Sequence, residues 1–525
     1  MLKKISTNQN VTTIVIIFLF SFSFFVNFFY GSLGVFPIDT FLHYDSGYRI
    51  LNGEYPIRDF WIVSGFFVDF FAALLFKIFG VNWYTHIAHA SLFNGLITIL
   101  TFYFFKKINL DTKFSFFYSI FFSILAYPPS GTPFVDHHAT FLSLAGLYFF
   151  ILGVKYGSNL YWYVFPWFLG CAFLCKQVPV TYLMILLIPI FLFFCVVKKN
   201  FNPIFKSTIS SIIFCVIFFL FLVITNIDFN LFLKQYILYP SSFGSARYDG
   251  FYLNLNTFFN NYKFILIVYI GVALLNYKFS YKNKNFFRSE NFFSFLILSS
   301  LVFSFIFHQV FTKNQIYIYF LVPLLCGILH SYINNFKFKP KKNLIISLII
   351  IFTLLISGKY HYRYNETRKF QDLKNINFKS GIDAGNIHSS LRGLNWITQD
   401  FSQNPNKEII IIKDVIQRLK EDKSNKILIT HYLFFSAITE QNLFSPSKTY
   451  TLDGASFPVK GGQFYNEYKE FLNSIITRNN IEKIYFIKNE KIKEKVIKNY
   501  INPNCYEIYE EKYFKYFLIK KKCFN

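Results

Sequence analysis

The chain has 525 residues, of which 54% are hydrophobic and 22% aromatic, and it carries a formal net charge of +25. Repeated apolar runs near the ~20 residues that a bilayer-spanning helix requires predict a polytopic membrane protein. The basic charge does not indicate nucleic-acid binding, because most of it is Lys in short loops and in the tail, not an Arg-rich stripe with base-stacking aromatics.

Eleven apolar runs predict membrane-spanning helices joined by polar loops. The first is too long for a signal-peptide core and has no small-residue cleavage site, so we interpret it as a retained anchor. The runs at 114–127 and 262–276 are short for a ~30 Å hydrocarbon core, which leaves their ends poorly defined. The predicted spans are 11–31, 84–105, 114–127, 138–154, 160–175, 178–197, 207–225, 262–276, 292–310, 315–334 and 343–358.

A twelfth apolar stretch, 61–80, carries Asp69 and Lys77, and we expect it to lie on the outer surface as a juxtamembrane helix. Under that assignment the cytoplasmic loops hold 17 basic residues and the outer loops hold eight, as the positive-inside rule requires. The N-terminus is then cytoplasmic. The same topology places eight of the ten carboxylates of residues 1–358 outside, so we expect the chemistry at the outer face.

The tail changes its pattern and predicts a small soluble α/β domain with some parallel strand pairing. We expect a helix or strand-to-helix at 408–422, a strand at 426–430, a helical stretch at 433–441, a helix at 467–480 and a strand at 481–488. The predicted organisation is a transmembrane domain, 1–358, with outer loops 32–83 and 226–263, followed by an extracytoplasmic domain, 359–525. Cys505 and Cys523 could form a disulfide there if the compartment is oxidising, and the sequence leaves this open.

The first outer loop is unusually acidic, since five of those ten carboxylates fall between Asp39 and Asp69. Asp39 directly follows the first span, close to the membrane plane, and is the leading candidate for a general base that takes a proton from a hydroxyl group. The alternative is that Asp39 caps a helix beginning near Thr40. Asp45 could contact an acceptor or be solvated.

The second outer loop places Asp136, His137 and His138 at the start of a span. These residues could bind a divalent cation or position a phosphate, but two adjacent His rarely bind one metal without help from another loop. The alternative is a capped helix start with interfacial His. Lys176 and Gln177 stand at another outer helix end, where Lys176 either snorkels or binds phosphate.

Two further cations belong to the predicted outer face. Arg247, followed by Tyr248, is the sole Arg of the loop 226–263, and Arg suits bidentate phosphate recognition. Lys313 stands at an outer helix end. Together with Lys176 these cations could hold the phosphate of an anionic lipid carrier.

In their order along the chain, these residues resemble the integral-membrane GT-C glycosyltransferases of the aminoarabinose-transferase and protein O-mannosyltransferase type. In that family a catalytic Asp follows the first span, and some fourteen residues later comes a turn like G-x-x-P-Y-R-D-F. Here Asp39 precedes the stretch GEYPIRDF at 53–60, which contains Arg58 and Asp59. The segments FKIFG at 76–80 and GCAFLCKQ at 170–177 also look like family motifs, as does Lys313 followed by Tyr319 and Pro323.

The resemblance covers about residues 11–335. This sequence departs from the family at Thr40, where a second acid is usual, and at Ile57, where Tyr is common. These departures leave the metal requirement and the acceptor undefined.

What the resemblance implies is inverting transfer of a sugar from a polyprenyl-phosphate donor to a hydroxyl of a glycan, glycolipid or protein acceptor, at the outer face of a bacterial inner membrane. Asp39 would be the base, Asp136 its helper, and Lys176, Arg247 and Lys313 the donor-phosphate ligands. Asp45, Arg58, Asp59, His137, Gln177 and Tyr248 complete the predicted substrate site. No cofactor is required, because lipid phosphate is a good leaving group, although Asp136 and His137 could bind a divalent cation.

Two other functions remain open at this point, a polysaccharide polymerase or ligase and a flippase or transporter of lipid-linked saccharide. A transporter is expected to keep ionisable residues near the bilayer midplane and often has internal repeats, and the sequence has neither signal. A polymerase or ligase would also use outer-loop cations, so the acidic loop discriminates against it only modestly.

Overall fold

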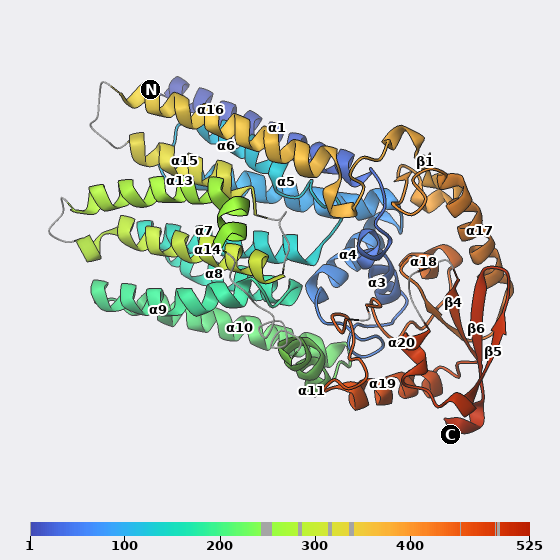
Figure 1. Ribbon diagram of the computed structural model, residues 1–525. Coiled ribbons are helices and arrows are strands. Elements are labelled where there is room, and N and C mark those ends of the chain that lie inside the picture. The colour runs from blue at the N-terminus through green and yellow to red at the C-terminus, as the bar shows by residue number, and fades with distance from the viewer. Residues whose placement is uncertain are drawn as a thin grey trace.

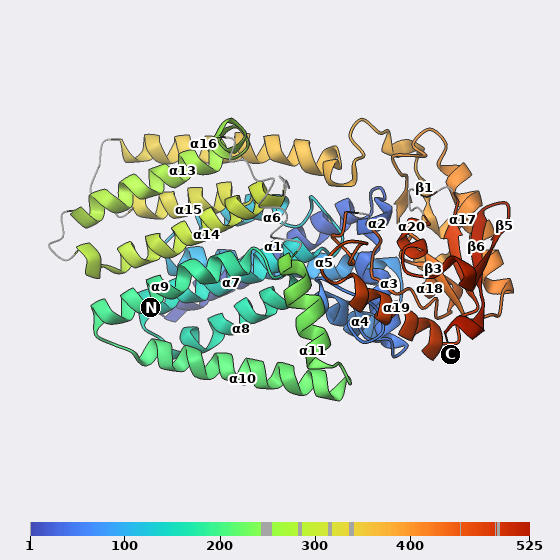
Figure 2. The ribbon, with the colours of Figure 1, turned by 60° about the horizontal axis from the view of Figure 1, so that its bottom comes forward.

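The computed structural model describes residues 2–242, 255–281, 286–312, 318–334, 341–451, 453–488, 490 and 494–524. It is mostly helical, with a few small sheets. A bundle of long helices is covered at one end by the C-terminal segment, which carries the strands (Figures 1 and 2). Three residues of the predicted substrate site, Arg247, Tyr248 and Lys313, lie outside the described residues.

Every predicted span overlaps a helix, and within the described residues eight helices are long and apolar enough to cross a membrane. The chain is therefore a helical membrane protein. These eight helices are α1 (Leu2–Gly31), α5 (Trp83–Lys107), α7 (Val135–Tyr156), α9 (Val180–Lys198), α10 (Asn202–Ile224), α13 (Leu255–Tyr281), α14 (Glu290–Thr312) and α16 (Lys342–His361).

The other three predicted spans are shorter helices: α6 (Thr112–Leu125), α8 (Asn159–Cys175) and α15 (Leu321–Asn334). A 14-residue helix such as α6 is about 21 Å long, less than the ~30 Å hydrocarbon core. The predicted short span at 262–276 is wrong in the other direction, because α13 begins at Leu255 and ends at Tyr281. Its polar residues, such as Asn260 and Asn261, end the apolar run but not the helix, so the predicted loop 226–263 ends too late.

Between α1 and α5 lie three helices, α2 (Pro37–Thr40), α3 (Leu42–Leu51) and α4 (Phe66–Phe79). The helix α4 occupies the stretch predicted to be juxtamembrane, and it does not meet the criteria for a span. It begins after Gly65 and ends at Gly80, both with positive φ. Figure 1 shows α3 and α4 between the helix bundle and the C-terminal segment.

Beyond α10 the chain forms α11 (Phe229–Phe232) and a π-helical turn, η1 (Leu233–Leu238), and beyond α16 it forms further short turns. A two-residue strand pair, β1 (Ile382–Asp383) and β2 (Asn395–Trp396), precedes the main sheet.

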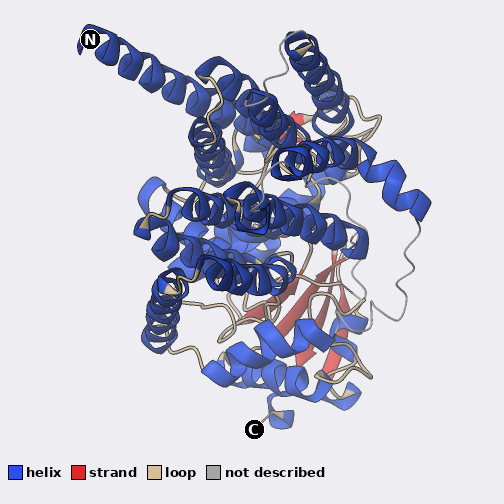
Figure 3. Ribbon diagram, turned by 90° about the vertical axis from the view of Figure 1, so that its left-hand side faces the viewer, coloured by secondary structure: helices blue, strands red, loops and turns tan. Residues whose placement is uncertain are grey.

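The C-terminal segment builds a four-stranded sheet with the strand order β3-β4-β6-β5 (Figure 3). The predicted helices and strands at 408–422, 426–430, 433–441, 467–480 and 481–488 are confirmed, and so is parallel pairing, between β3 and β4. The antiparallel β5–β6 hairpin was not predicted. The elements are α17 (Pro405–Glu421), β3 (Lys426–Ile429), α18 (Phe435–Thr439), α19 (Tyr465–Arg478), β4 (Lys483–Ile487), α20 (Lys495–Lys498), β5 (Tyr506–Glu510) and β6 (Phe514–Ile519).

A disulfide joins Cys505 to Cys523, which settles the pairing that the sequence left open. It connects the residue just before β5 to the turn that follows β6. The bond therefore closes the base of the hairpin at the end of the chain.

The C-terminal segment shares a hydrophobic core with the loop that follows α1. Val35 and Phe41 pack in one buried cluster with Trp396 and Phe434. The main chains also meet, since the Asn395 N–H donates to the Ser32 carbonyl at 2.9 Å and the Trp61 N–H donates to the Pro446 carbonyl at 2.8 Å. The segment that contains Asp39 is therefore flanked on either side along the chain by contacts with the C-terminal segment.

Candidate functional site

A buried polar cluster lies where α7, α8 and α14 meet, at the end of the bundle that faces the C-terminal segment. The helices α7 and α8 are consecutive and antiparallel, so Asp136 in the first turn of α7 meets Lys176 at the C-terminal cap of α8. Lys176 Nζ lies 2.8 Å from both carboxylate oxygens of Asp136, and His308 Nε2 of α14 lies 2.9 Å from Oδ1. Each charge also suits its helix end, an anion at the N-terminus and a cation at the C-terminus.

Asp39 lies within α2, and its carboxyl group is engaged by no hydrogen bond or ion pair in the part of the chain that the structure describes. The alternative that Asp39 caps the next helix is wrong, because α3 has Phe41 at its N-cap and no side-chain cap. Within the described structure, the Asp39 carboxyl group is therefore free to accept a proton from a bound substrate.

The pKa of Asp39 is raised to about 7, mainly by burial and also by the charges of Asp136 and Asp372, while the Lys176 ammonium acts to lower it. The charges of Asp136 and Lys176 both act on Asp39, so we treat Asp39 together with this pair. A group with a pKa near 7 is ionised in half of the molecules at neutral pH and suits general base catalysis.

A second buried cluster, which the sequence did not predict, joins α3, α4 and the C-terminal segment. Lys448 Nζ lies 2.6 and 2.7 Å from the two carboxylate oxygens of Asp69, and His43 Nδ1 lies 2.6 Å from Oδ1. Asp69 and His43 are fully buried. Burial lowers the pKa of His43 well below its usual range, and the Lys448 ammonium lowers it further, so this imidazole is neutral.

Gly65 separates the two clusters and permits their close approach. Its φ of +89° is in the left-handed region, and a Cβ atom there would lie 2.7 Å from Lys448 Nζ, 2.9 Å from His43 Cε1 and 3.0 Å from Val135 Cγ1. Its N–H donates to the Cys175 carbonyl at 2.7 Å, beside Lys176. Only glycine fits both the conformation and the space.

Arg58 and Asp59 form a separate cluster that shapes the turn at 53–60. Arg58 Nη2 lies 2.7 Å from Asp59, and Arg478 of α19 lies 2.9 Å from the same carboxylate. Arg58 also donates to the main-chain carbonyls of Gly53 and Thr225. These bonds tie the turn to the C-terminal segment and to the end of α10, and they do not join the Asp39 group.

The remaining predicted site residues have mainly internal partners. Asp45 is buried beside Arg49 and Ser436, and burial raises its pKa. The Gln177 amide donates to the main-chain carbonyls of Val63 at 2.9 Å and Tyr236 at 2.5 Å, which fixes the loop before α4.

His137 is fully buried, with its ring centroid 4.8 Å from that of Tyr127. Among the described residues no group of three or more His, Cys, Asp or Glu could hold a metal ion. The Asp136 carboxylate, one of the two residues predicted to bind a cation, is instead occupied by Lys176 and His308.

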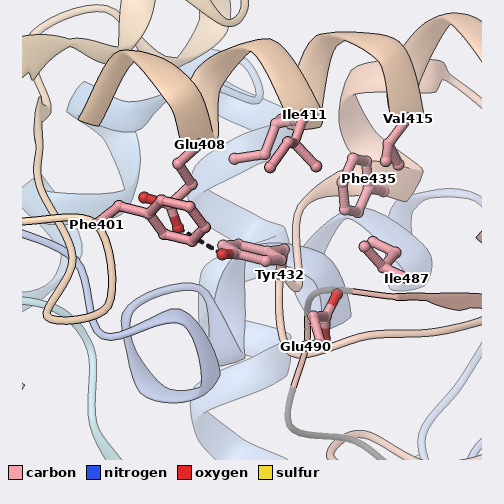
Figure 4. Close-up of a pocket in the computed structure, with 9 residues that line it drawn as sticks. Phe401, Glu408, Ile411, Val415, Tyr432, Phe435, Ile487 and Glu490 are labelled. Atoms are coloured by element: carbon pink, nitrogen blue, oxygen red, sulfur yellow. Dashed lines mark hydrogen bonds between the residues drawn. The ribbon is translucent and has the colours of Figure 1, made fainter. Parts of the chain in front are cut away.

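Two cavities lie on different sides of this site. An apolar groove of about 390 Å³ runs between α9, α13 and α14 and is lined by Tyr182, Phe258, Phe303, Phe307 and Val310, among others. A second cavity of about 360 Å³ lies between residues 35–38 and the C-terminal segment. A small pocket against α17 shares the walls of this second cavity at Phe401, Glu408, Tyr432 and Glu490 (Figure 4).

His308, a hydrogen-bond partner of Asp136, was not predicted, because no motif in the sequence of α14 distinguishes this residue. Lys448 was not predicted because it lies 379 positions from Asp69. Asp69 itself was the available signal, a carboxylate inside an apolar run that must find a partner when buried. No protein-family model matches the chain, and no curated protein matches it.

Proposed function

We propose that the protein is a membrane glycosyltransferase that transfers a sugar from a polyprenyl-phosphate donor to an acceptor hydroxyl, with inversion at the anomeric carbon. The proposal includes eleven spans with α4 on the outer membrane surface, a cytoplasmic N-terminus and an extracytoplasmic α/β domain. The observation that carries it is Asp39, an unengaged carboxyl group with a pKa of about 7 beside the Asp136–Lys176 pair.

In the proposed reaction the acceptor oxygen attacks the anomeric carbon while its proton passes to Asp39. The bond between the anomeric carbon and the phosphate oxygen breaks, and polyprenyl phosphate leaves with the bonding electron pair. Lys176 is placed to stabilise the developing phosphate charge, since its ammonium has three donors and the two oxygens of Asp136 accept from it. Asp136 holds Lys176 and His308 in place.

The apolar groove supports a lipid-linked donor. It is lined by Phe307, the neighbour of His308, and by Tyr182, which follows Gln177 by five residues near the start of α9. An isoprenoid chain in this groove would place its phosphate at the end of the bundle where Lys176 lies. A sugar nucleotide is polar and charged, so it would gain little from contact with this apolar groove.

The disulfide between Cys505 and Cys523 supports the proposed orientation. Disulfides persist in oxidising compartments and are rare in the cytosol. This observation is independent of the loop charges, which support the same orientation through the positive-inside rule.

The test uses the full-length protein reconstituted in liposomes with a panel of polyprenyl-phosphate sugars and a crude glycan acceptor fraction. We expect transfer from one of these donors by the wild type and loss of at least about a thousandfold in rate in Asp39→Asn, which keeps the size of the side chain but cannot accept the proton. Asp111→Asn, at the opposite end of the bundle, is the matched control and keeps full activity. Equal rates for Asp39→Asn and Asp111→Asn would show that Asp39 is not the base.

A further inference from the structure

The cavity between residues 35–38 and the C-terminal segment lies next to Asp39 along the chain. Ile38 lines it, and Asp39 is the following residue. Its volume of about 360 Å³ falls in the range of small-molecule sites. The apolar groove is lined by other elements, α9, α13 and α14, so the two cavities offer two different chemistries.

Three carboxyl groups give this cavity strong hydrogen-bond acceptors, beside side chains that can also donate. The polar lining consists of Asp400, Glu408, Glu490, Thr398, Gln399, Thr451, His431, Tyr432 and Tyr450, and no Lys or Arg lines the cavity among the residues that the structure describes. A ligand carrying phosphate or carboxylate would meet the carboxylates of Asp400 and Glu408 without a Lys or Arg to pair with. A ligand rich in hydroxyl groups would donate to them.

The inner wall is rigid and partly aromatic. Glu408 is buried and accepts hydrogen bonds from Trp396 Nε1 at 3.0 Å and from Thr398 Oγ1 at 2.7 Å. It also accepts from the Tyr432 hydroxyl (Figure 4). Tyr432 and Phe401 add ring surface to the wall. Aromatic faces beside oriented carboxylates fit a pyranose ring, which has apolar C–H faces and donor hydroxyls at its rim.

Glu490 extends the same chemistry. Its two oxygens accept from the Thr430 hydroxyl at 2.5 Å and from the His431 N–H at 2.6 Å. Burial raises the pKa of Glu490 to about 8, so at neutral pH this side chain is protonated and adds no negative charge to the cavity. It can then donate a hydrogen bond as well as accept one.

We infer that this cavity binds the sugar acceptor, a saccharide that carries no phosphate or carboxylate group, beside the segment that carries Asp39. The inference rests on the proposed function, since Asp39 has an acceptor only if the protein transfers a group. It goes beyond that function by naming the acceptor class and the residues that select it.

The test measures binding and not transfer. Methyl glycosides of neutral hexoses and of N-acetylhexosamines, and the corresponding hexose 6-phosphates and uronic acids, are titrated into the full-length protein in nanodiscs and followed by saturation-transfer NMR. We expect binding of neutral glycosides only, and an affinity about tenfold weaker in Asp400→Asn and in Phe401→Ala, as the loss of one charged hydrogen bond or of ring contact predicts. The control Glu421→Gln removes an exposed carboxylate of α17 outside the cavity and leaves the affinity unchanged.

Three results would overturn the inference: no binding of any neutral glycoside, equal or tighter binding of the anionic sugars, or an unchanged affinity in both cavity variants. The Asp39→Asn variant distinguishes saccharide binding from sugar transfer. It is expected to bind the glycoside without transferring a sugar to it. Binding to the wild type without transfer from any lipid-linked donor would reject the glycosyltransferase and leave the saccharide site standing.

Discussion

Two features of Asp39 suit it to the proposed proton transfer: its burial near charged groups, and the pairing of Lys176 with Asp136. Lys176 is close enough to affect its charge but forms its ion pair with Asp136. If Lys176 paired with Asp39 instead, the pKa of Asp39 would lie far below neutral and the base would be weak. Under the proposed function, the two carboxylates therefore have different tasks.

The raised pKa also makes a prediction about stability. Between the ordinary value of 3.8 and the folded value of about 7, the folded state binds more protons at Asp39 than the unfolded state does. The contribution of this group to the free energy of unfolding therefore falls as pH rises through that interval. We expect Asp39→Asn to be more stable than the wild type at pH values above 7 and equally stable near the lower end of the interval, as measured by denaturant unfolding in bicelles. If Asp39→Asn were more stable than the wild type by the same amount at every pH, the raised pKa of Asp39 would not be the cause.

Gly65 is the other residue whose local geometry leads to a prediction. Gly65→Ala places a methyl group against Lys448 and His43 and forces an unfavourable φ, whereas Gly53→Ala at φ +83° meets no atom within 4 Å. Both variants share the backbone strain, so their difference isolates the crowding. We expect Gly65→Ala to lose about 1 to 3 kcal/mol more than Gly53→Ala in the free energy of unfolding. Equal losses would mean that the contact between the two clusters is loose.

At the scale of elements, the Lys448–Asp69 pair connects the C-terminal segment to α4. Burying two charges is costly, and removing one partner leaves the other charge buried and unpaired. We expect Lys448→Met and Asp69→Asn each to cost about 3 to 5 kcal/mol in stability, and the double variant to cost clearly less than their sum.

A double-mutant cycle on the full-length protein gives this coupling, and Arg418→Met with Glu511→Gln serves as the matched cycle on a half-exposed pair. That control pair is expected to couple by less than about 1 kcal/mol. Additive effects at Lys448 and Asp69 would show that the pair does not hold the two elements together.

At the scale of the whole molecule, the proposed topology predicts which loops face which compartment. Single Cys residues placed at Val81 and at Asn109 are labelled with a membrane-impermeant maleimide in intact cells, with the parent protein as background. We expect labelling at Val81 from outside and at Asn109 only after permeabilisation, because they flank α5 on opposite sides. Labelling of the Cys at position 109 in intact cells would show that the orientation is the opposite of the proposed one.

The sequence predicts the bundle well because each span is a local apolar run, and it predicts α17, α19, β3 and β4 because their periodicities are local as well. It fails at the ends of α13, where polar residues continue a helix, and at β5, a strand with mostly exposed side chains. For the site, the order of acids and cations leads to Asp39, Asp136 and Lys176. His308, Lys448 and the shared core of Val35 with Trp396 depend on packing between distant segments, which no local pattern records.

The pH dependence of transfer by the reconstituted protein is the most direct test of Asp39 as the base. With a saturating lipid-linked donor, the initial rate is expected to rise with a single ionisation near pH 7, because only the deprotonated carboxylate accepts the proton. Lys176→Met is expected to shift that ionisation to higher pH, since the ammonium lowers the pKa of Asp39. A rate that stays constant between about pH 5 and 9, or an ionisation that does not move in Lys176→Met, would contradict base catalysis by Asp39.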